Sequence, residues 1–249
     1  MQRFILALFF VLFASTTCFA DSIDDLNAAI RAMKGNQTHT AKQLLAKVIQ
    51  DINSSNEHKA QAYYLYSIVE KDPAEAIVYC SKAIDLAPND SRYYEKLGVL
   101  YYQTHDYENA IKNLDKAISI TPISAEAYSL RGLAYRDLGN IEKALPDLDK
   151  AITLDPNVGV YYARRGVARF QANQQDGALE DLTKALERNL AQPIQANCYF
   201  YAAKIYMNKH QYDKAKALFS ASLNIMSEED KIQEARKLLE QIRIADKWS

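Results

Sequence analysis

The chain has 249 residues, of which 30 are lysine or arginine and 31 are aspartate or glutamate, so its formal net charge is -1. This balance gives no electrostatic reason to expect a nucleic-acid binder, which needs many phosphate contacts, or attraction to an anionic membrane. Only seven glycines and six prolines are present, which argues against a turn-rich β-sandwich or a glycine-looped phosphate site and favours helices.

The first twenty residues have the organisation of an export signal. Arg3 precedes an unbroken apolar run from Phe4 to Ala14, and Cys18 and Ala20 place small residues before a cleavage site. We therefore expect residues 1–20 to be removed and residues 21–249 to be secreted, or periplasmic in a Gram-negative bacterium. A membrane anchor is the alternative, although this run spans about 16 Å against a hydrocarbon core of about 30 Å. Lipid modification of Cys18 also stays open, although no Leu-small-small-Cys box surrounds it.

The strongest internal similarity lies at an offset of 34 residues, where segments 91–124, 125–158 and 159–192 align without a gap. Each segment has a tyrosine, a glycine four positions later, and then alanines and a leucine at fixed positions. These positions are Tyr94, Tyr128 and Tyr162; Gly98, Gly132 and Gly166; Ala110, Ala144 and Ala178; Leu114, Leu148 and Leu182; and Ala117, Ala151 and Ala185. The spacing marks one face of each of two helices, so each segment is predicted to form an antiparallel helix pair.

This pattern resembles the tetratricopeptide repeat, a helix-turn-helix unit of 34 residues. The resemblance implies an all-α fold, a right-handed solenoid of helical hairpins, because a single hairpin cannot bury its apolar faces and copies must stack. Weaker copies at residues 22–55, 60–90 and 196–229 raise the number of repeats to about six. Residues 228–247 are predicted to form a helix that caps the last repeat, with one apolar side made of Ile232, Ala235, Leu238, Leu239 and Ile242.

No pattern of reactive side chains points to catalysis, a metal or a cofactor. The four histidines fall in predicted turns and linkers, and no Cys-x-x-Cys, His-Glu-x-x-His, Gly-x-Ser-x-Gly or phosphate-loop sequence occurs. Acidic pairs such as Asp147 with Asp149, or Glu180 with Asp181, lie beside lysines and are interpreted as exposed charges that keep the surface soluble. We therefore predict that the protein is not an enzyme.

Cys80 and Cys198 are the two cysteines of the expected mature chain. They fall in the repeats at 60–90 and 196–229, which lie four repeats apart. Stacked helices lie about 8 to 10 Å apart, so this separation is on the order of 30 Å or more, whereas a disulfide requires α-carbons within about 7 Å. We therefore predict that they are not bonded to each other. Cys80 occupies the position held by Leu114 and its equivalents, where a free cysteine packs as a small hydrophobic residue.

Resemblance to tetratricopeptide proteins implies that the first helices line a concave groove that holds a peptide or a partner segment. The residue after each packing position is rotated by about 100° toward that groove. Tyr102, Arg136 and Phe170 are the sharpest candidates, whereas packing between adjacent first helices explains Val99, Leu133 and Val167 equally well. The predicted partner-binding residues are Tyr64, Arg92, Glu95, Val99, Tyr102, Glu126, Leu133, Arg136, Val167, Phe170, Phe200 and Lys204.

The function predicted from the sequence is that of a non-catalytic scaffold that binds a protein or peptide after export. Nucleic acid is not an expected partner, and no second apolar stretch in the sequence is long enough to insert the mature chain into a membrane. Two alternatives stay open: self-association into a structural oligomer, and a role as an accessory subunit of an envelope or secretion complex. Some family members bind a C-terminal carboxylate with a set of Lys and Asn residues in the groove, and the predicted partner-binding residues contain no comparable set.

Overall fold

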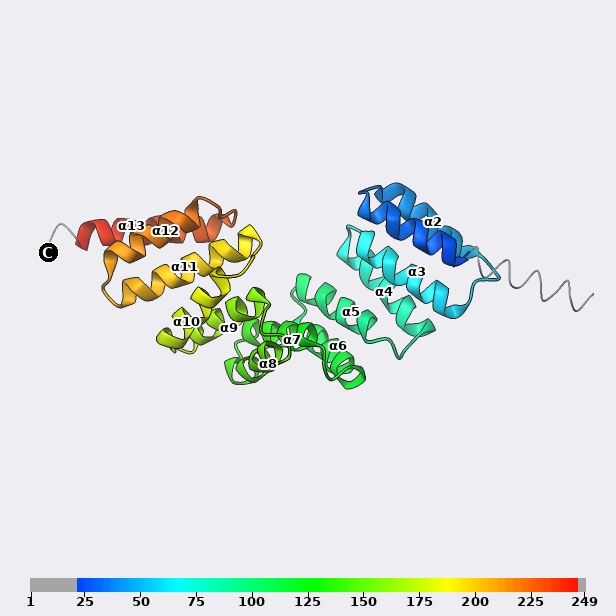
Figure 1. The fold of residues 1–249 in the computed structure, drawn as a ribbon, viewed down its shortest axis with the longest axis horizontal. Coiled ribbons are helices and arrows are strands. Elements are labelled where there is room, and N and C mark those ends of the chain that lie inside the picture. Colours follow the sequence, from blue (N-terminus) through cyan, green and yellow to red (C-terminus); the bar gives the residue numbers. More distant parts are fainter. Residues whose placement is uncertain (1–21, 246–249) are drawn as a thin grey trace, which may run out of the picture. The chain divides into compact units, whose positions relative to one another are not determined.

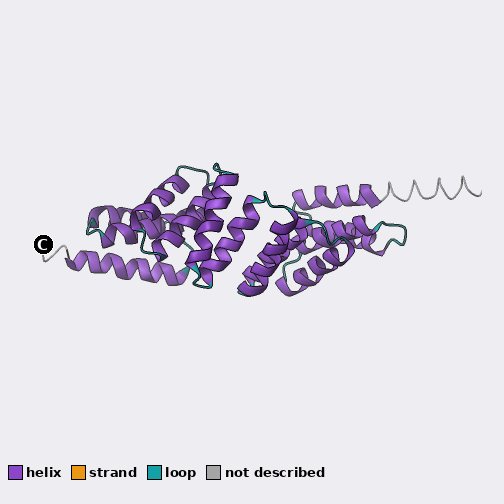
Figure 2. Ribbon diagram, turned by 90° about the horizontal axis from the view of Figure 1, so that it is seen from below, coloured by secondary structure: helices purple, strands orange, loops and turns teal. Residues whose placement is uncertain are grey.

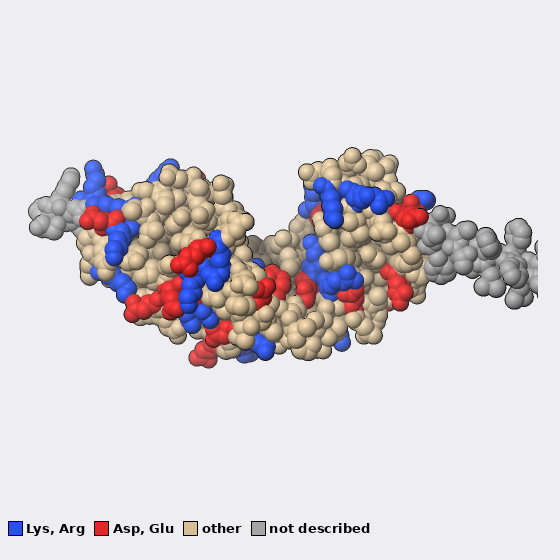
Figure 3. Space-filling model, in the orientation of Figure 1, with Lys and Arg blue, Asp and Glu red and all other residues tan. Residues whose placement is uncertain are grey.

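The computed structural model describes residues 22–245, and within this range every regular element is a helix (Figure 2). The predicted export signal and the last residues of the predicted capping helix lie outside the described range. The chain divides into two compact units, one ending at Pro122 and the other beginning at Ile123. Figure 3 shows acidic and basic side chains interspersed over the face that it draws.

The first unit is built from helices that pack in chain order (Figure 1). After the helical residues 22–34 come α2 (Thr38–Gln50), α3 (Asn56–Val69), α4 (Pro73–Leu86), α5 (Ser91–Gln103) and α6 (Tyr107–Ile120). Helices α3 and α4 form one hairpin, and α5 and α6 form another. Neighbouring hairpins are joined by the packing of α2 against α3 and of α4 against α5. Buried Leu26, Ala29, Leu45 and Val48 form its first core cluster together with Ala62 and Leu65 of α3.

The second unit continues the same arrangement of hairpins and ends in a single helix. Its elements are α7 (Ala125–Asp137), α8 (Ile141–Leu154), α9 (Gly159–Gln171), α10 (Gln175–Leu186), α11 (Gln192–Asn208), α12 (Tyr212–Leu223) and α13 (Glu229–Ala245). Helix α13 packs on α12. Its Ala235 and Ile242 join Phe200 and Phe219 in one core cluster, so the last hairpin is covered by the amphipathic helix that the sequence predicts.

The repeated glycines and leucines explain how closely the two helices of a hairpin approach. At Gly132 an added Cβ would lie 2.9 Å from Leu148 Cγ and 3.0 Å from the Ala144 carbonyl oxygen, closer than real side chains pack. Gly98 and Gly166 face Leu114 and Leu182 in the same way. A residue without a side chain is therefore required where the first helix crosses the second.

The turns inside the hairpins also repeat, because all but one contain a residue in the left-handed backbone region. These residues are Asn36, His105, Gly139, Asn173 and His210. In each of these turns the following residue donates its backbone N–H to a carbonyl five residues earlier, as Asn140 does to Tyr135 at 2.8 Å. The turn between α3 and α4 has the same length of three residues but no left-handed residue, and there Asp72 caps α4 and Pro73 is its first residue.

Two aspartates interpreted as exposed from the sequence are buried instead. Arg131 donates two hydrogen bonds of 2.7 Å to Asp147, and Arg165 donates to Asp181 at 2.8 and 2.6 Å. Asp181 is fully buried and Asp147 is 8% exposed. The sequence pattern does not reveal these pairs, because each arginine lies on the first helix of the hairpin and its aspartate on the second, sixteen positions later.

Candidate functional site

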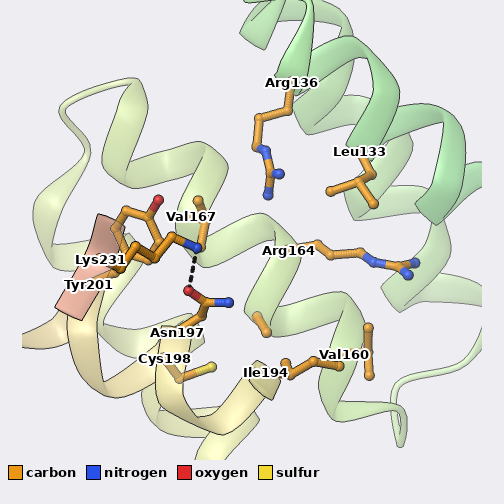
Figure 4. Close-up of a pocket in the computed structure, with 11 residues that line it drawn as sticks. Leu133, Arg136, Val160, Arg164, Val167, Ile194, Asn197, Cys198, Tyr201 and Lys231 are labelled. Carbon is orange, nitrogen blue, oxygen red and sulfur yellow. Dashed lines mark hydrogen bonds between the residues drawn. The ribbon is translucent and has the colours of Figure 1, made fainter. Parts of the chain in front are cut away.

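A pocket of about 260 Å³ lies in the second unit, at the side of the hairpins where their first helices meet (Figure 4). Four helices build it, namely α7, α9, α11 and α13. The lining residues are Leu133, Arg136, Val160, Ala163, Arg164, Val167, Ile194, Asn197, Cys198, Tyr201 and Lys231. All of them belong to one compact unit, so the pocket is contained within it.

Helical periodicity explains why α9 supplies the floor of the pocket. Val160, Ala163, Arg164 and Val167 are separated by three, one and three positions, which places them on one face of the helix. The residues on α11 repeat this spacing with Ile194, Asn197, Cys198 and Tyr201. The two helices pack against each other, so these faces form adjacent walls.

The floor of the pocket is apolar and well packed. Val167 is 8% exposed, Ala163 5% and Cys198 1%, while Val160 and Ile194 are half-buried. Burial raises the pKa of the Cys198 thiol to about 12, so this sulfur is not a nucleophile at neutral pH. Burial also raises the pKa of Tyr201, and its phenol therefore stays protonated and presents an uncharged hydroxyl.

Three basic side chains line the pocket, and no acidic residue does. Arg136 pairs with its neighbour Asp137 at 2.6 Å. Arg164 donates to the Ser129 hydroxyl at 2.7 Å and reaches Glu126 only at 3.4 Å. In Figure 4 the Arg136 side chain extends from α7 toward the pocket, whereas Arg164 extends toward α7.

Lys231 reaches the pocket from α13 and ties that helix to α11. Its ammonium group donates to Asn197 Oδ1 at 2.7 Å and lies 2.7 Å from Glu228 (Figure 4). Burial acts to raise the pKa of Glu228, but the hydrogen bonds from Lys231 and Asn197 and the lysine charge outweigh it, and the pKa is lowered overall. Glu228 is therefore ionised and holds Lys231 at the pocket.

Three of the groove residues predicted from the sequence line this pocket, namely Leu133, Arg136 and Val167. Two more lie beside it. Phe170 has its ring 5.3 Å from that of Tyr201, and Lys204 lies 5.5 Å from the Phe170 ring and pairs with Glu234. Glu126 is exposed.

Phe200 is placed differently from the expectation. It is 1% exposed and packs against Phe219 with ring centroids 5.9 Å apart. Its side chain lies in the core of the last hairpin, because Phe219 of α12 packs against it. Phe200 therefore supports the wall from behind and does not face the pocket.

The remaining predicted residues belong to the first unit. Tyr64 packs against Tyr93 with ring centroids 5.1 Å apart, and Arg92 pairs with Asp90 at 2.6 Å. Tyr102 lies 5.5 Å from the Tyr107 ring. Glu95 and Val99 are half-buried on the same helix. These five side chains are not part of the pocket in the second unit.

Several lining residues are absent from the set predicted from the sequence. Val160 and Arg164 lie seven and three positions before Val167, so extending the predicted row along the helical period would have found them. Tyr201 occupies the position of Arg164 one repeat later. Lys231 carries no signal of this kind, because the capping helix falls outside the repeat alignment.

Metal binding and membrane insertion find no support in the described part of the chain. Between residues 22 and 245, no three His, Cys, Asp or Glu side chains gather as metal ligands would. In the same range no helix combines the length and the apolar character needed to cross a membrane.

Two family models of the tetratricopeptide repeat match the middle of the chain. The family model of the tetratricopeptide repeat matches residues 125–158, and a second model of the TPR repeat matches residues 100–136. No curated protein sequence matches the chain.

Many solved structures share this fold. PilF of Pseudomonas aeruginosa is 16% identical with a TM-score of 0.74, and the match covers 89% of this chain and 99% of PilF. MamA is 23% identical with a TM-score of 0.57, covering 67% of this chain and 91% of MamA. YrrB, described as a TPR protein with an unusual peptide-binding site, is 21% identical with a TM-score of 0.58, covering 78% and 97%. The predicted all-α hairpin fold is confirmed, and residues 100–158 carry tetratricopeptide repeats.

Proposed function

We propose that the pocket of the second unit binds an extended segment of a partner protein and that the chain acts as a non-catalytic scaffold. Tetratricopeptide-repeat proteins are generally scaffolds of this kind, and their domains bind proteins or peptides. The observation that carries the proposal is the apolar floor formed by Val160, Val167 and Ile194 under a polar rim. A side chain of the partner fills this floor and removes its apolar surface from water.

The size of the pocket fits one large side chain. An engineered cavity of about 150 Å³ takes up benzene, so about 260 Å³ has room for an aromatic or branched aliphatic group together with part of its backbone. The pocket is too small for a folded domain. An extended segment that places one anchor residue in it is therefore the favoured ligand.

Site-specific photo-crosslinking tests this proposal. A photoreactive amino acid at Val160 or Leu133 would report contacts inside the pocket, and the same group at exposed Lys150 on α8 is the control. We expect adducts with one partner segment from the pocket positions and few from Lys150. Equal labelling from all three positions would place the binding surface elsewhere, and adducts with a second copy of the chain would favour the oligomer.

The compartment of action belongs to the same proposal. The pattern of Arg3, the apolar run to Ala14 and the small residues at Cys18 and Ala20 supports export and cleavage, so the scaffold would act in the periplasm or outside the cell. N-terminal sequencing of the protein from its host tests this. We expect Asp21 as the first residue, and a chain that starts at Met1 and sediments with membranes would show an anchor.

A further inference from the structure

The charges around the pocket carry an inference that rests on the proposed function and makes it more specific. Basic groups reach the pocket from three helices, with Arg136 on α7, Arg164 on α9 and Lys231 on α13. Their acidic partners Asp137, Glu126 and Glu228 are not among the lining residues. A ligand in the pocket therefore meets cations and apolar groups.

These cations have hydrogen-bond donors left for a ligand. A guanidinium carries five N–H groups in a planar fork, and Arg136 uses Nε and one terminal nitrogen on Asp137. The contacts of Arg164 with Ser129 and Glu126 both use Nη1. Lys231 has three donors, of which Asn197 and Glu228 take two.

The apolar floor makes such donors effective. Burial of the ligand displaces water from the pocket, and a charge-assisted hydrogen bond is stronger where water is excluded. A basic ligand group would be repelled, and a wholly apolar ligand would bury part of the basic rim without new hydrogen bonds. The arrangement favours a ligand that supplies a carboxylate beside its apolar anchor.

We propose that the pocket recognises a peptide segment in which a large apolar residue lies close in sequence to an aspartate or glutamate. The apolar side chain lies between Val160, Val167 and Ile194. The carboxylate accepts hydrogen bonds from Arg136 of α7 and Lys231 of α13, both of which reach toward the pocket in Figure 4.

Selection from a random peptide library displayed on phage tests the proposal whatever the natural partner is. The full chain is the target, and selected peptides are synthesised and their Kd is measured. We expect enrichment of aromatic or branched aliphatic residues with Asp or Glu nearby. Replacing that acidic residue by its amide should weaken binding about tenfold, which corresponds to about 1.4 kcal/mol, and raised salt should weaken the acidic peptide but not the amide.

Variants of the protein locate the effect. Arg136→Gln and Lys231→Met should each reduce the preference for the acidic peptide over its amide, and the two substitutions together should abolish it. The double variant Arg136→Glu with Lys231→Glu should select Lys or Arg beside the same apolar residues. The matched control is Arg236→Glu with Lys237→Glu, which makes the same change in charge at exposed positions of α13. Circular dichroism checks that each variant is folded.

The possible failures are distinguishable. Selected peptides that lose affinity in Leu133→Ser or Val160→Ser but show no acidic preference would overturn this inference and leave the proposed function standing. An acidic preference that the control double variant abolishes equally would show a general charge effect and would also overturn it. If no selected peptide depends on the pocket residues, the proposed function fails and the inference with it.

Discussion

Asp181 shows how strongly burial determines the contribution of a single charged residue to stability. It is fully buried and accepts hydrogen bonds from both Arg165 and Arg169. Asp149 pairs with the same Arg165 at 2.6 Å, but its side chain is 54% exposed. Solvent screens the second pair and not the first.

We predict that Asp181→Ala lowers the free energy of unfolding by about 2 to 3 kcal/mol, because it removes the buried anion that Arg165 and Arg169 share and leaves Arg165 only the exposed Asp149. Asp149→Ala is the matched control and should change it by less than about 1 kcal/mol. Urea denaturation followed by circular dichroism measures both. Equal effects would show that the buried pair is no more important for stability than the exposed one.

Cys80 and Cys198 give a second prediction at the scale of the residue. Both are free and buried within the described residues, and burial raises the pKa of each thiol to about 12. The thiolate is the reactive form, so we expect neither cysteine to react with Ellman's reagent at pH 8 until the protein is unfolded.

An exposed cysteine provides the positive control for that experiment. Ser227 is exposed, and Ser227→Cys should react at once while the two native thiols do not. Rapid reaction of one native thiol in the folded protein would show that its helix opens locally. A peptide joining Cys80 to Cys198 in the monomer would contradict the repeat register itself.

At the scale of the element, two glycines on one hairpin are predicted to behave in opposite ways. An added Cβ at Gly166 of α9 would lie 2.9 Å from Leu182 Cγ, whereas at Gly177 of α10 it would meet Arg169 atoms at 3.4 Å. Gly166→Ala should therefore destabilise the protein by about 1 to 2 kcal/mol through overpacking. Gly177→Ala should stabilise it by about 0.5 to 1 kcal/mol, because alanine favours the helix.

Thermal unfolding of the two variants beside the parent chain measures both signs. Destabilisation by both substitutions would mean that Arg169 cannot yield at Gly177. Stabilisation by both would mean that the crossing of α9 and α10 relaxes easily, and the repeated glycines would then need another explanation.

The elements follow from the sequence to different degrees. The glycine and leucine positions predict the hairpin crossings because they repeat at a fixed offset, and the apolar side of the last helix predicts its packing through Ala235 and Ile242. The burial of Asp147 and Asp181 depends on arginines from another helix, so no local pattern reveals it.

The pocket was predictable only in part for the same reason. Leu133, Arg136 and Val167 follow from helical geometry within the repeat. Lys231 arrives from a helix outside the repeat pattern, and Phe200 is drawn into the core by Phe219 on the next helix. Contacts of this kind, between side chains of different helices, can be identified only from the packed structure.

For the chain as a whole, the groups that burial keeps protonated predict how stability varies with pH. Burial raises the pKa of Cys80, Cys198, Tyr93 and Tyr161 to about 12 in each case. In the unfolded chain, cysteine titrates near about 8.5 and tyrosine near about 10. Above these values the unfolded state has lost protons that the folded state still holds.

The sign follows from linkage. The unfolded state binds fewer protons above these values and is therefore favoured as pH rises. The contribution of these four groups to folding stability is fully present below about pH 8.5 and is lost progressively up to about pH 12. We therefore expect Tm to fall steadily between about pH 8.5 and about pH 12. Lysines also lose their charge in this range, so the slope of the parent chain alone does not identify the groups responsible.

Variants in which these side chains are replaced by ones that cannot ionise identify the groups responsible for the fall in Tm. Tyr93→Phe combined with Tyr161→Phe should reduce the fall of Tm above about pH 10 and leave the curve below about pH 9 parallel to that of the parent. Cys198→Ala should reduce the fall from about pH 8.5 upward, because its thiol titrates earlier in the unfolded chain. If all the curves run parallel up to about pH 12, the buried thiols and phenols do not govern alkaline unfolding, and the loss of lysine charge in the surface ion pairs does.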